Sequence, residues 1–241
     1  MRFDLFVAQR LDISRNKASE LIKSGKILLN GEVETKPNKE AGEDDKINLL
    51  EEVYVGRGAL KLKSFLEHYK LDLKGKTALD IGSSTGGFVQ ILLKEGASRV
   101  TALDVGNSQL DESLKSDSRV EVKEDTDIRE FAREAKFEDE SMKFDVVTCD
   151  VSFISATQIL ADIFRVAKKD IIILFKPQFE VGREAKRNKK GVVTDAKAVS
   201  QARAKFELAA ANLGLVLRAC QQCEIRGKEG NAEFFYSFNK V

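Results

Sequence analysis

The sequence predicts an α/β domain with a doubly wound, mainly parallel sheet, preceded by a small α+β domain. Three observations support this prediction. From about residue 58, short apolar runs alternate with stretches of helical spacing, which is the pattern of parallel strands joined by crossover helices. The first 50 residues instead show helical spacing followed by a hairpin signal. The length of 241 residues accommodates one or two domains.

Composition and charge exclude several classes of protein. The 40 basic and 39 acidic residues give a net charge of +1, which excludes a uniformly basic coat for nucleic acid but permits a local basic face. No apolar run approaches the roughly 18–20 residues that span a bilayer. Acidic residues also interrupt the N-terminal stretch, so it is not a secretory signal. We therefore expect a cytoplasmic protein without a membrane partner.

Neither a disulfide framework nor a metal site is expected. The three cysteines are odd in number and too few for such a framework. Cys220 and Cys223 form an isolated pair without the further ligands that a zinc site needs. The single histidine, His68, is expected at the surface or in packing, and its isolation argues against histidine-dependent catalysis.

The first 50 residues are predicted to form the small α+β domain. Ser14 has the character of a helix N-cap, apolar residues follow it at helical spacing, and Gly25 can end that helix. The apolar run Ile27–Leu29 and the turn Asn30-Gly31 then predict a hairpin.

Positive charge gathers in the helical part of this unit. Between positions 10 and 26, five basic residues face two acidic ones. This surface is a candidate for contact with a phosphate backbone, and the alternative is an ordinary solvated helix face. The five basic residues are Arg10, Arg15, Lys17, Lys23 and Lys26.

From about residue 58, apolar runs predict strands and amphipathic spacing predicts helices. The predicted strands are Thr77–Ile81, Val100–Leu103, Phe144–Cys149, Ile171–Phe175, Val216–Ala219 and Glu233–Phe238. The predicted helices contain Phe88 to Leu92, Ile154 to Ala167 and Ala196 to Leu213. The last two strands are expected to pair antiparallel and to add an antiparallel edge to the sheet.

A glycine-rich turn, LDIGSSTGGF at residues 79–88, joins the first of these strands to its helix. Gly82 permits a sharp turn, and two further glycines permit the close approach of a ligand or of a packed helix. The turn lacks the third glycine of the dinucleotide pattern. Asp104 closes the next strand and suits a ribose with free hydroxyls, and Asp80 can complement a cationic methionine moiety. We therefore favour S-adenosylmethionine over NAD; the alternative is a tight connection that binds nothing.

Four charged residues lie at predicted strand ends or in adjoining loops: Lys61, Asp150, Lys176 and Glu233. Ligands of open α/β sheets bind outside the carboxyl ends of the strands, so we expect Asp150 and Lys176 to face the same crevice as Gly82. A charge at a strand end is most often simply solvated. Lys176 differs because the apolar run before it indicates a central, buried strand.

The order of these four residues resembles the Lys-Asp-Lys-Glu tetrad of the RrmJ/FtsJ-type ribose 2′-O-methyltransferases. The segments GRGALKL, LDIGSSTGGF, DVG, CDVSFIS, FKPQFEVGRE and GNAEFF together resemble the TlyA family of rRNA methyltransferases, often labelled haemolysin-like. The N-terminal RLDISRNKASELIKSGKILLNG resembles the alpha-L RNA-binding fold of the ribosomal-protein S-four type. The resemblance covers nearly the whole chain, with Gly56 where serine is expected and Ser83 where alanine is common.

The resemblance implies an RNA-binding domain at residues 1–50, a linker at 51–57 and a Rossmann-like methyltransferase domain at 58–241. It implies S-adenosylmethionine as donor and a cytidine 2′-hydroxyl in ribosomal RNA as acceptor. The partner would be RNA in ribosomal subunits or in assembly intermediates. Because the chain resembles the shorter subgroup of the family, the large subunit is the expected target.

The expected donor-binding residues surround the glycine-rich turn and the ends of the neighbouring strands. They are Asp80, Gly82, Ser83, Ser84, Thr85, Gly86, Gly87, Phe88, Asp104, Val105 and Asp150. A second basic cluster follows Lys176 and is expected to rim the crevice and meet RNA, the alternative being a solvated loop. Its residues, with Arg57 near the linker, are Arg183, Lys186, Arg187, Lys189 and Lys190.

The tetrad has a defined chemical task under this hypothesis. Lys176 is the candidate for the central role, either neutral as a base or charged as a stabiliser of the developing alkoxide. Asp150 and Lys61 would orient the acceptor and tune Lys176, and Glu233 would hold the ribose or Lys61. Alignment of the reacting atoms supplies most of the acceleration, since it is worth up to about 7–11 kcal/mol.

Other functions compete with this hypothesis. A non-enzymatic RNA-binding assembly factor would keep the basic surfaces but need no donor pocket. A haemolysin-like, membrane-active protein lacks support, because no spanning segment or strongly amphipathic basic helix is visible. Several phenylalanines are expected in the core or in a pocket wall rather than as base-stacking platforms, with Phe179 the first to test: Phe6, Phe88, Phe153 and Phe179.

Overall fold

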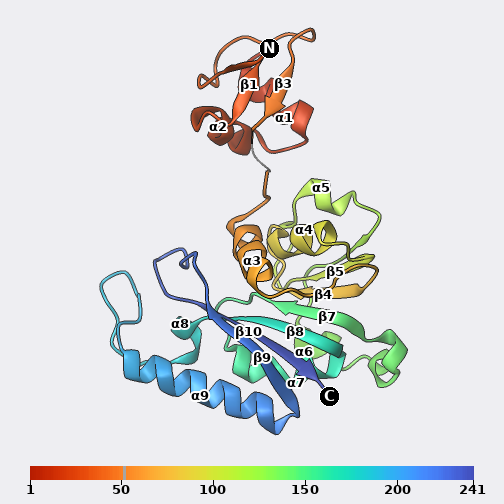
Figure 1. Cartoon of the computed structure of the whole chain (residues 1–241), viewed down its shortest axis with the longest axis vertical. Coiled ribbons are helices and arrows are strands. Elements are labelled where there is room, and N and C mark those ends of the chain that lie inside the picture. Colours follow the sequence, from red (N-terminus) through yellow and green to blue (C-terminus); the bar gives the residue numbers. More distant parts are fainter. Residues whose placement is uncertain (51–52) are drawn as a thin grey trace. The chain divides into compact units, whose positions relative to one another are not determined.

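The computed structural model describes residues 1–50 and 53–241 (Figure 1). The contacts divide the chain into two compact units, Met1–Val53 and Tyr54–Val241. The first two residues of the predicted linker 51–57 lie outside the described residues. Its last residue, Arg57, is already the first residue of helix α3.

The N-terminal unit packs two helices against a small antiparallel sheet with the strand order β2-β1-β3. Its elements are α1 (Phe3–Leu11), α2 (Arg15–Lys23), β1 (Ile27–Leu29), β2 (Glu32–Val33) and β3 (Ile47–Leu49). Ser14 caps α2 as predicted, because its side chain accepts a hydrogen bond from the Lys17 N–H at 3.2 Å. Asn30 and Gly31 have φ angles of 53° and 89°, as the predicted tight hairpin turn requires.

The second unit contains a sheet with the order β6-β5-β4-β7-β8-β10-β9. Its strands are β4 (Thr77–Ile81), β5 (Arg99–Leu103), β6 (Val120–Lys123), β7 (Phe144–Cys149), β8 (Ala167–Phe175), β9 (Leu215–Gln222) and β10 (Phe234–Lys240). Its α-helices are α3 (Arg57–His68), α4 (Gly87–Lys94), α5 (Glu112–Lys115), α6 (Ile128–Phe131), α7 (Ala156–Val166), α8 (Pro177–Glu180) and α9 (Ala196–Asn212). Two short 3-10 helices, Ala135–Glu138 and Glu140–Met142, precede β7.

The predicted fold class is confirmed. Strands β4 to β8 pair in parallel, and β10 pairs antiparallel with both β8 and β9. The antiparallel strand is therefore not the edge strand: β10 lies between β8 and β9, and β9 forms the edge. This position of β10 matters for the site, because β10 runs antiparallel to β8 and therefore begins at the edge of the sheet where β8 ends. Phe234 at the start of β10 lies opposite Phe175 at the end of β8.

Helices cover both faces of the sheet (Figure 1). Residues Ile171, Ile173 and Phe175 of β8 pack in the cluster that contains α7 and α9. The alternate residues Ile172 and Leu174 pack in the cluster that contains α3 and α4. Burial on both faces explains the continuous apolar run of this strand. The packing of α3 on the sheet also places Lys61 near the carboxyl ends of the parallel strands.

Candidate active site

Asp150 and Lys176 follow the neighbouring strands β7 and β8 directly, and their side chains form an ion pair. The distance between Lys176 Nζ and Asp150 Oδ1 is 2.7 Å. Lys176 Nζ also donates a hydrogen bond to Ser152 Oγ at 2.9 Å. Parallel pairing of β7 with β8 places both strand ends at one edge of the sheet, so these contacts follow from the topology.

Lys61 and Glu233 form a second ion pair, which is buried. Lys61 lies on α3 and Glu233 directly precedes β10, and Lys61 Nζ donates to Glu233 Oε2 at 2.6 Å. Only 6% of Lys61 and 2% of Glu233 are exposed. Packing of Phe65 on α3 against Phe235 on β10, with ring centroids 4.6 Å apart, holds the two elements together.

The two ion pairs belong to one electrostatic cluster. Removal from water raises the pKa of Asp150 above its ordinary value. The positive charges of Lys176 and Lys61 oppose that rise, and the negative charge of Glu233 adds to it. All four residues of the predicted tetrad thus influence one another through space.

The glycine-rich turn packs tightly against this cluster. Gly82 has a φ of +80°, and a Cβ atom there would lie 2.9 Å from the backbone oxygen of Asp150. A Cβ atom on Gly87 would lie 2.6 Å from the backbone nitrogen of Ala59 on α3. The glycines therefore let the turn approach both the β7 end and the helix that carries Lys61.

Asp80 contributes a buried carboxylate with a free oxygen. Its Oδ1 accepts a hydrogen bond from Thr148 Oγ1 at 2.6 Å, whereas Oδ2 has no hydrogen-bond partner among the described residues. Burial raises the pKa of Asp80 to about 7, and the nearby charges of Asp150 and Asp104 add to the rise. A buried, unpartnered acceptor of this kind suits a cationic ligand group.

Two adjoining cavities lie along the carboxyl edge, with volumes of about 700 Å³ and about 240 Å³. Gly82, Ser84, Asp150 and Ser152 line both of them. All predicted donor-binding residues except Gly86 line one or both cavities. A Cβ atom on Gly86 would instead meet the side chains of two packed leucines.

Asp104 is held rigidly at the larger cavity. Its Oδ1 accepts from the Gly106 N–H at 2.8 Å, and its Oδ2 accepts from the Ser84 N–H at 2.7 Å. Each carboxylate oxygen keeps a second lone pair for a ligand hydroxyl.

Part of the cavity lining was not predicted from the sequence. Thr126 and Asp127, which directly precede α6, and Ile128, its first residue, line the larger cavity. Asp127 also caps α6 by accepting a hydrogen bond from the Arg129 N–H at 2.8 Å. The sequence does contain a helix-capping pattern here, Asp-x-Arg at residues 127–129. This pattern indicates a ligand-binding residue only when the preceding strand β6 is known to belong to the sheet.

The predicted RNA-binding residues of the N-terminal unit differ in their surroundings. Arg15 Nε donates to Asp4 Oδ2 at 3.1 Å, and Arg2 also pairs with Asp4. Hydrogen bonds from Arg2 and Arg15 lower the pKa of Asp4 to about 2. Arg15 therefore has a structural partner, and Arg10 donates to the backbone oxygen of Glu43.

Residues 186–194, which contain four of the five residues of the second basic cluster, form a hairpin, and Arg183 precedes it. Arg187 forms an antiparallel bridge with Val193, and its guanidinium donates to backbone oxygens of the preceding turn, so it stabilises the loop. Four of the five predicted residues are exposed: Arg183, Lys186, Lys189 and Lys190. Arg57, predicted to contact RNA, is exposed and lines the smaller cavity.

Phe153 does not lie in the core, but it lines the larger cavity, in agreement with the pocket-wall alternative. Phe153 is 93% exposed at the rim of the larger cavity, and its φ is +68°. Its ring lies 5.4 Å from that of Phe179. Phe6 and Phe88 are buried, as expected.

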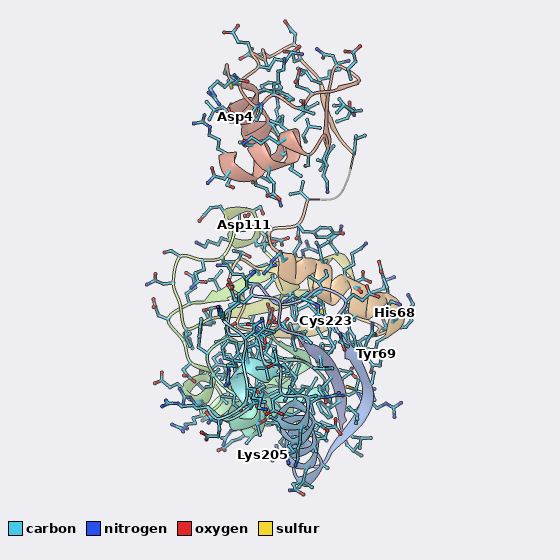
Figure 2. All side chains as sticks on the ribbon, turned by 90° about the vertical axis from the view of Figure 1, so that its left-hand side faces the viewer. Asp4, His68, Tyr69, Asp111, Lys205 and Cys223 are labelled. Carbon is cyan, nitrogen blue, oxygen red and sulfur yellow. The ribbon has the colours of Figure 1, made fainter. Side chains whose placement is uncertain are left out.

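Other candidate features lie away from the site. His68 is exposed at the end of α3 (Figure 2), and its Nδ1 lies 2.9 Å from the Ser64 backbone oxygen. The described residues contain no cluster of histidine, cysteine, aspartate or glutamate that could hold a metal ion. No helix in the described ranges has the length and apolar character to cross a bilayer.

The fold and the site are those of a methyltransferase domain preceded by an RNA-binding module. Residues 54–240 match the FtsJ-like methyltransferase family, and residues 1–47 match the S4 domain. The chain is 49% identical, over the full length of both proteins, to the 23S rRNA (cytidine-2′-O)-methyltransferase TlyA of Campylobacter jejuni. It is 37% identical to the 16S/23S rRNA (cytidine-2′-O)-methyltransferase TlyA of Mycobacterium tuberculosis, over 95% of this chain and 85% of that one.

A solved structure from Lactococcus lactis, of a protein that carries a provisional hemolysin name, superposes with a TM-score of 0.71 at 39% identity. The match covers 78% of this chain and 89% of that one. The chain belongs to the TlyA family of FtsJ-like methyltransferases, which confirms the resemblance seen in the sequence.

Proposed function

We propose that the protein transfers a methyl group from S-adenosylmethionine to the ribose 2′-hydroxyl of a cytidine in large-subunit ribosomal RNA. One observation carries the proposal: the pair Lys176–Asp150 lines a cavity that Asp80 also lines, and the pair Lys61–Glu233 lies close enough to act electrostatically on Asp150. The relative from Campylobacter jejuni, which matches over its full length, is named for 23S rRNA.

The cavity residues fit the proposed donor. Asp80 would meet the positive charge of the methionine moiety, and Asp104 would accept hydrogen bonds from the ribose hydroxyls. Arg57, which lines the smaller cavity, would complement the donor carboxylate. When bound, the donor supplies a methyl group already activated by a sulfonium.

We assign Lys176 an electrostatic role. Its Nζ forms an ion pair with Asp150 Oδ1 at 2.7 Å. A charged Lys176 stabilises the negative charge that develops on the acceptor oxygen as its proton leaves. Asp150 and Ser152 fix the position of the ammonium, and the Lys61–Glu233 pair supports the same pocket from α3.

RNA would be recognised by surfaces outside the tetrad. The S4 domain supplies one basic surface, and the 186–194 hairpin with Arg183 before it supplies another. The exposed ring of Phe153 offers a face on which a splayed nucleobase can stack. This arrangement suits a ribose that must leave its helix to be reached.

Transfer of labelled methyl groups to ribosomal particles tests the proposal. Large subunits from a strain that lacks the protein should accept one methyl group per particle, and mapping should place it on a cytidine ribose. Methylation of a base, or no transfer despite donor binding, would contradict the proposal. Failure to bind the donor, with RNA binding intact, would instead favour the assembly-factor alternative.

The hairpin contribution is tested by salt dependence. Neutralising Arg183, Lys186, Lys189 and Lys190 with glutamine should weaken particle binding and flatten its dependence on salt, because each lost phosphate contact lowers the slope by about 0.7–0.9. The matched control neutralises Lys168 and Lys169, which are exposed at the start of β8. Equal salt slopes for the two variants would reject the hairpin as an RNA contact.

A further inference from the structure

We propose that Glu180 is a positioning residue that holds the loops carrying Asp150 and Lys176 at their catalytic spacing. The inference rests on the proposed function and adds a residue to its machinery. Glu180 ends α8, which begins at Pro177 directly after Lys176. Its side chain, however, acts on the loop that follows β7.

The Glu180 carboxylate accepts three short hydrogen bonds from the start of α7. The donors are Ser155 Oγ at 2.6 Å, the Ala156 N–H at 2.6 Å and Thr157 Oγ1 at 2.8 Å. Helix α7 begins where the loop from Asp150 to Ile154 ends. A carboxylate attached to one catalytic loop therefore anchors the far end of the other.

The N-terminus of α7 has no capping acceptor from its own N-cap side chain, and Glu180 supplies one. Ser155 occupies the N-cap position, yet its side chain makes no capping hydrogen bond to α7. Its hydroxyl instead donates to Glu180, which also accepts the Ala156 N–H. In α2, by contrast, the N-cap Ser14 accepts from the Lys17 N–H of its own helix.

The hydrogen bonds of Glu180 act on the loop between Asp150 and Ile154, which contains a strained and exposed residue, Phe153. Phe153 has a φ of +68°, and a bulky residue in that region persists only where its surroundings impose it. Besides the Glu180 contacts, the two loops meet through the Lys176 contacts with Asp150 and Ser152 and through the Phe153–Phe179 rings. Without Glu180, those contacts and the sheet edge, where the Asp150 N–H donates to the Ile81 backbone oxygen at 2.9 Å, remain to hold the spacing of Asp150 and Lys176.

The experiment compares Glu180→Ala, Glu180→Gln and wild type in the full chain. Each protein is assayed for kcat and KM with large subunits, for donor affinity by calorimetry and for melting temperature. We expect Glu180→Ala to lower kcat by about 100-fold, the effect of a misplacement near 1 Å, with donor affinity and KM within about threefold. Glu180→Gln should retain kcat within about tenfold, because its amide oxygen accepts the Ala156 N–H and its NH2 can donate to the hydroxyls.

A matched control separates positioning from stability. Asp139 caps a 3-10 helix before β7 by accepting the Ser141 N–H at 2.8 Å, and it belongs to no part of the site. Asp139→Ala should lower the melting temperature but keep kcat. If Glu180→Ala does not fold, Thr157→Val and Ser155→Ala each remove one of the three hydrogen bonds and should lower kcat in part.

The inference is overturned if folded Glu180→Ala, or both single-bond variants, turn over at the wild-type rate. It is also overturned if kcat falls equally in Asp139→Ala. A wild-type protein that transfers no methyl group would refute the proposed function itself. Normal transfer by wild type and by the Glu180 variants would refute this inference alone.

Discussion

Lys61 and Glu233 are separated by 172 positions in the chain, and their charged atoms lie 2.6 Å apart in a buried pair. The pair joins α3, which precedes the first strand of the large sheet, to the start of β10, its last strand. Removal of one partner would leave an uncompensated charge in a nearly dry environment. The pair therefore affects both folding and the site, and the two effects can be separated.

Lys61→Met should destabilise the protein by about 3–5 kcal/mol, because Glu233 then loses its buried counter-ion. The double variant Lys61→Met/Glu233→Leu should recover most of that loss, since no buried charge remains unpaired. Urea denaturation measures the stability, and the transfer assay measures the activity. Activity should stay lost in the double variant; its recovery together with stability would limit the pair to a structural role.

Lys176→Ala should retain donor binding and lose methyl transfer by about 100-fold or more, because it removes the charge assigned to stabilise the acceptor oxygen. Calorimetry and single-turnover transfer measure the two effects separately. Ser152→Ala removes one contact of Lys176 and should cost less. Transfer by Lys176→Ala within about tenfold of wild type would remove Lys176 from the centre of the mechanism.

Donor affinity should depend on pH through Asp80. Its pKa is raised to about 7, and a cationic donor requires the ionised form, so affinity should rise as the pH increases through 7 and level off above it. Binding at pH 6.5 should release protons, which calorimetry detects in buffers of different ionisation enthalpy. A pH-independent affinity between pH 6 and 8 would contradict this assignment.

Asp80→Asn should bind the donor weakly but fold more stably at neutral pH. A buried aspartate with a raised pKa loses stability as the pH rises from its unfolded value near 3.8 toward 7, so the gain on substitution is complete above pH 7 and vanishes below pH 4. The shift corresponds to about 4 kcal/mol at most. Denaturation at pH 4 and at pH 8 measures it, and equal effects at both would exclude titration of Asp80 as the cause.

Gly227→Ala should impair methyl transfer, although Gly227 has no side chain that could take part in the reaction. A Cβ atom at this position would lie 2.6 Å from Glu233 Oε1, so the carboxylate that binds Lys61 must shift. We expect transfer to fall by at least about tenfold with donor affinity unchanged. Gly42→Ala is the matched control, because nothing lies within 4 Å of a Cβ atom there. Equal activity of the two variants would show that Glu233 tolerates displacement.

The sequence predicts the central strands well because they are buried on both faces. The bounds of β4 and β7 agree with the predicted runs, whose apolar residues stop at a charged residue or a glycine. Strand β8 extends back to Ala167, before its predicted start, because its outer end carries the exposed Lys168 and Lys169. Strand β6 was missed because all four of its residues are half-buried and form no apolar run.

The site was predictable to the extent that its residues follow strands. The end of a parallel strand fixes the neighbourhood of Asp150 and Lys176. The partner of Glu233 was left open between the ribose and Lys61, because only the packing of α3 over the sheet decides it. Glu180 was not predicted at all, since its contacts cross between two loops that no local pattern connects.

The insertion of β10 between β8 and β9 has a consequence for biosynthesis. During translation β10, which directly follows Glu233, is made after every other strand of the sheet. It must then insert between β8 and β9, which are already made. Until β10 has been made, the Lys61 ammonium on α3 lacks Glu233 as its counter-ion. A nascent chain therefore completes the Lys61–Glu233 pair only after all the other strands of the sheet have been made.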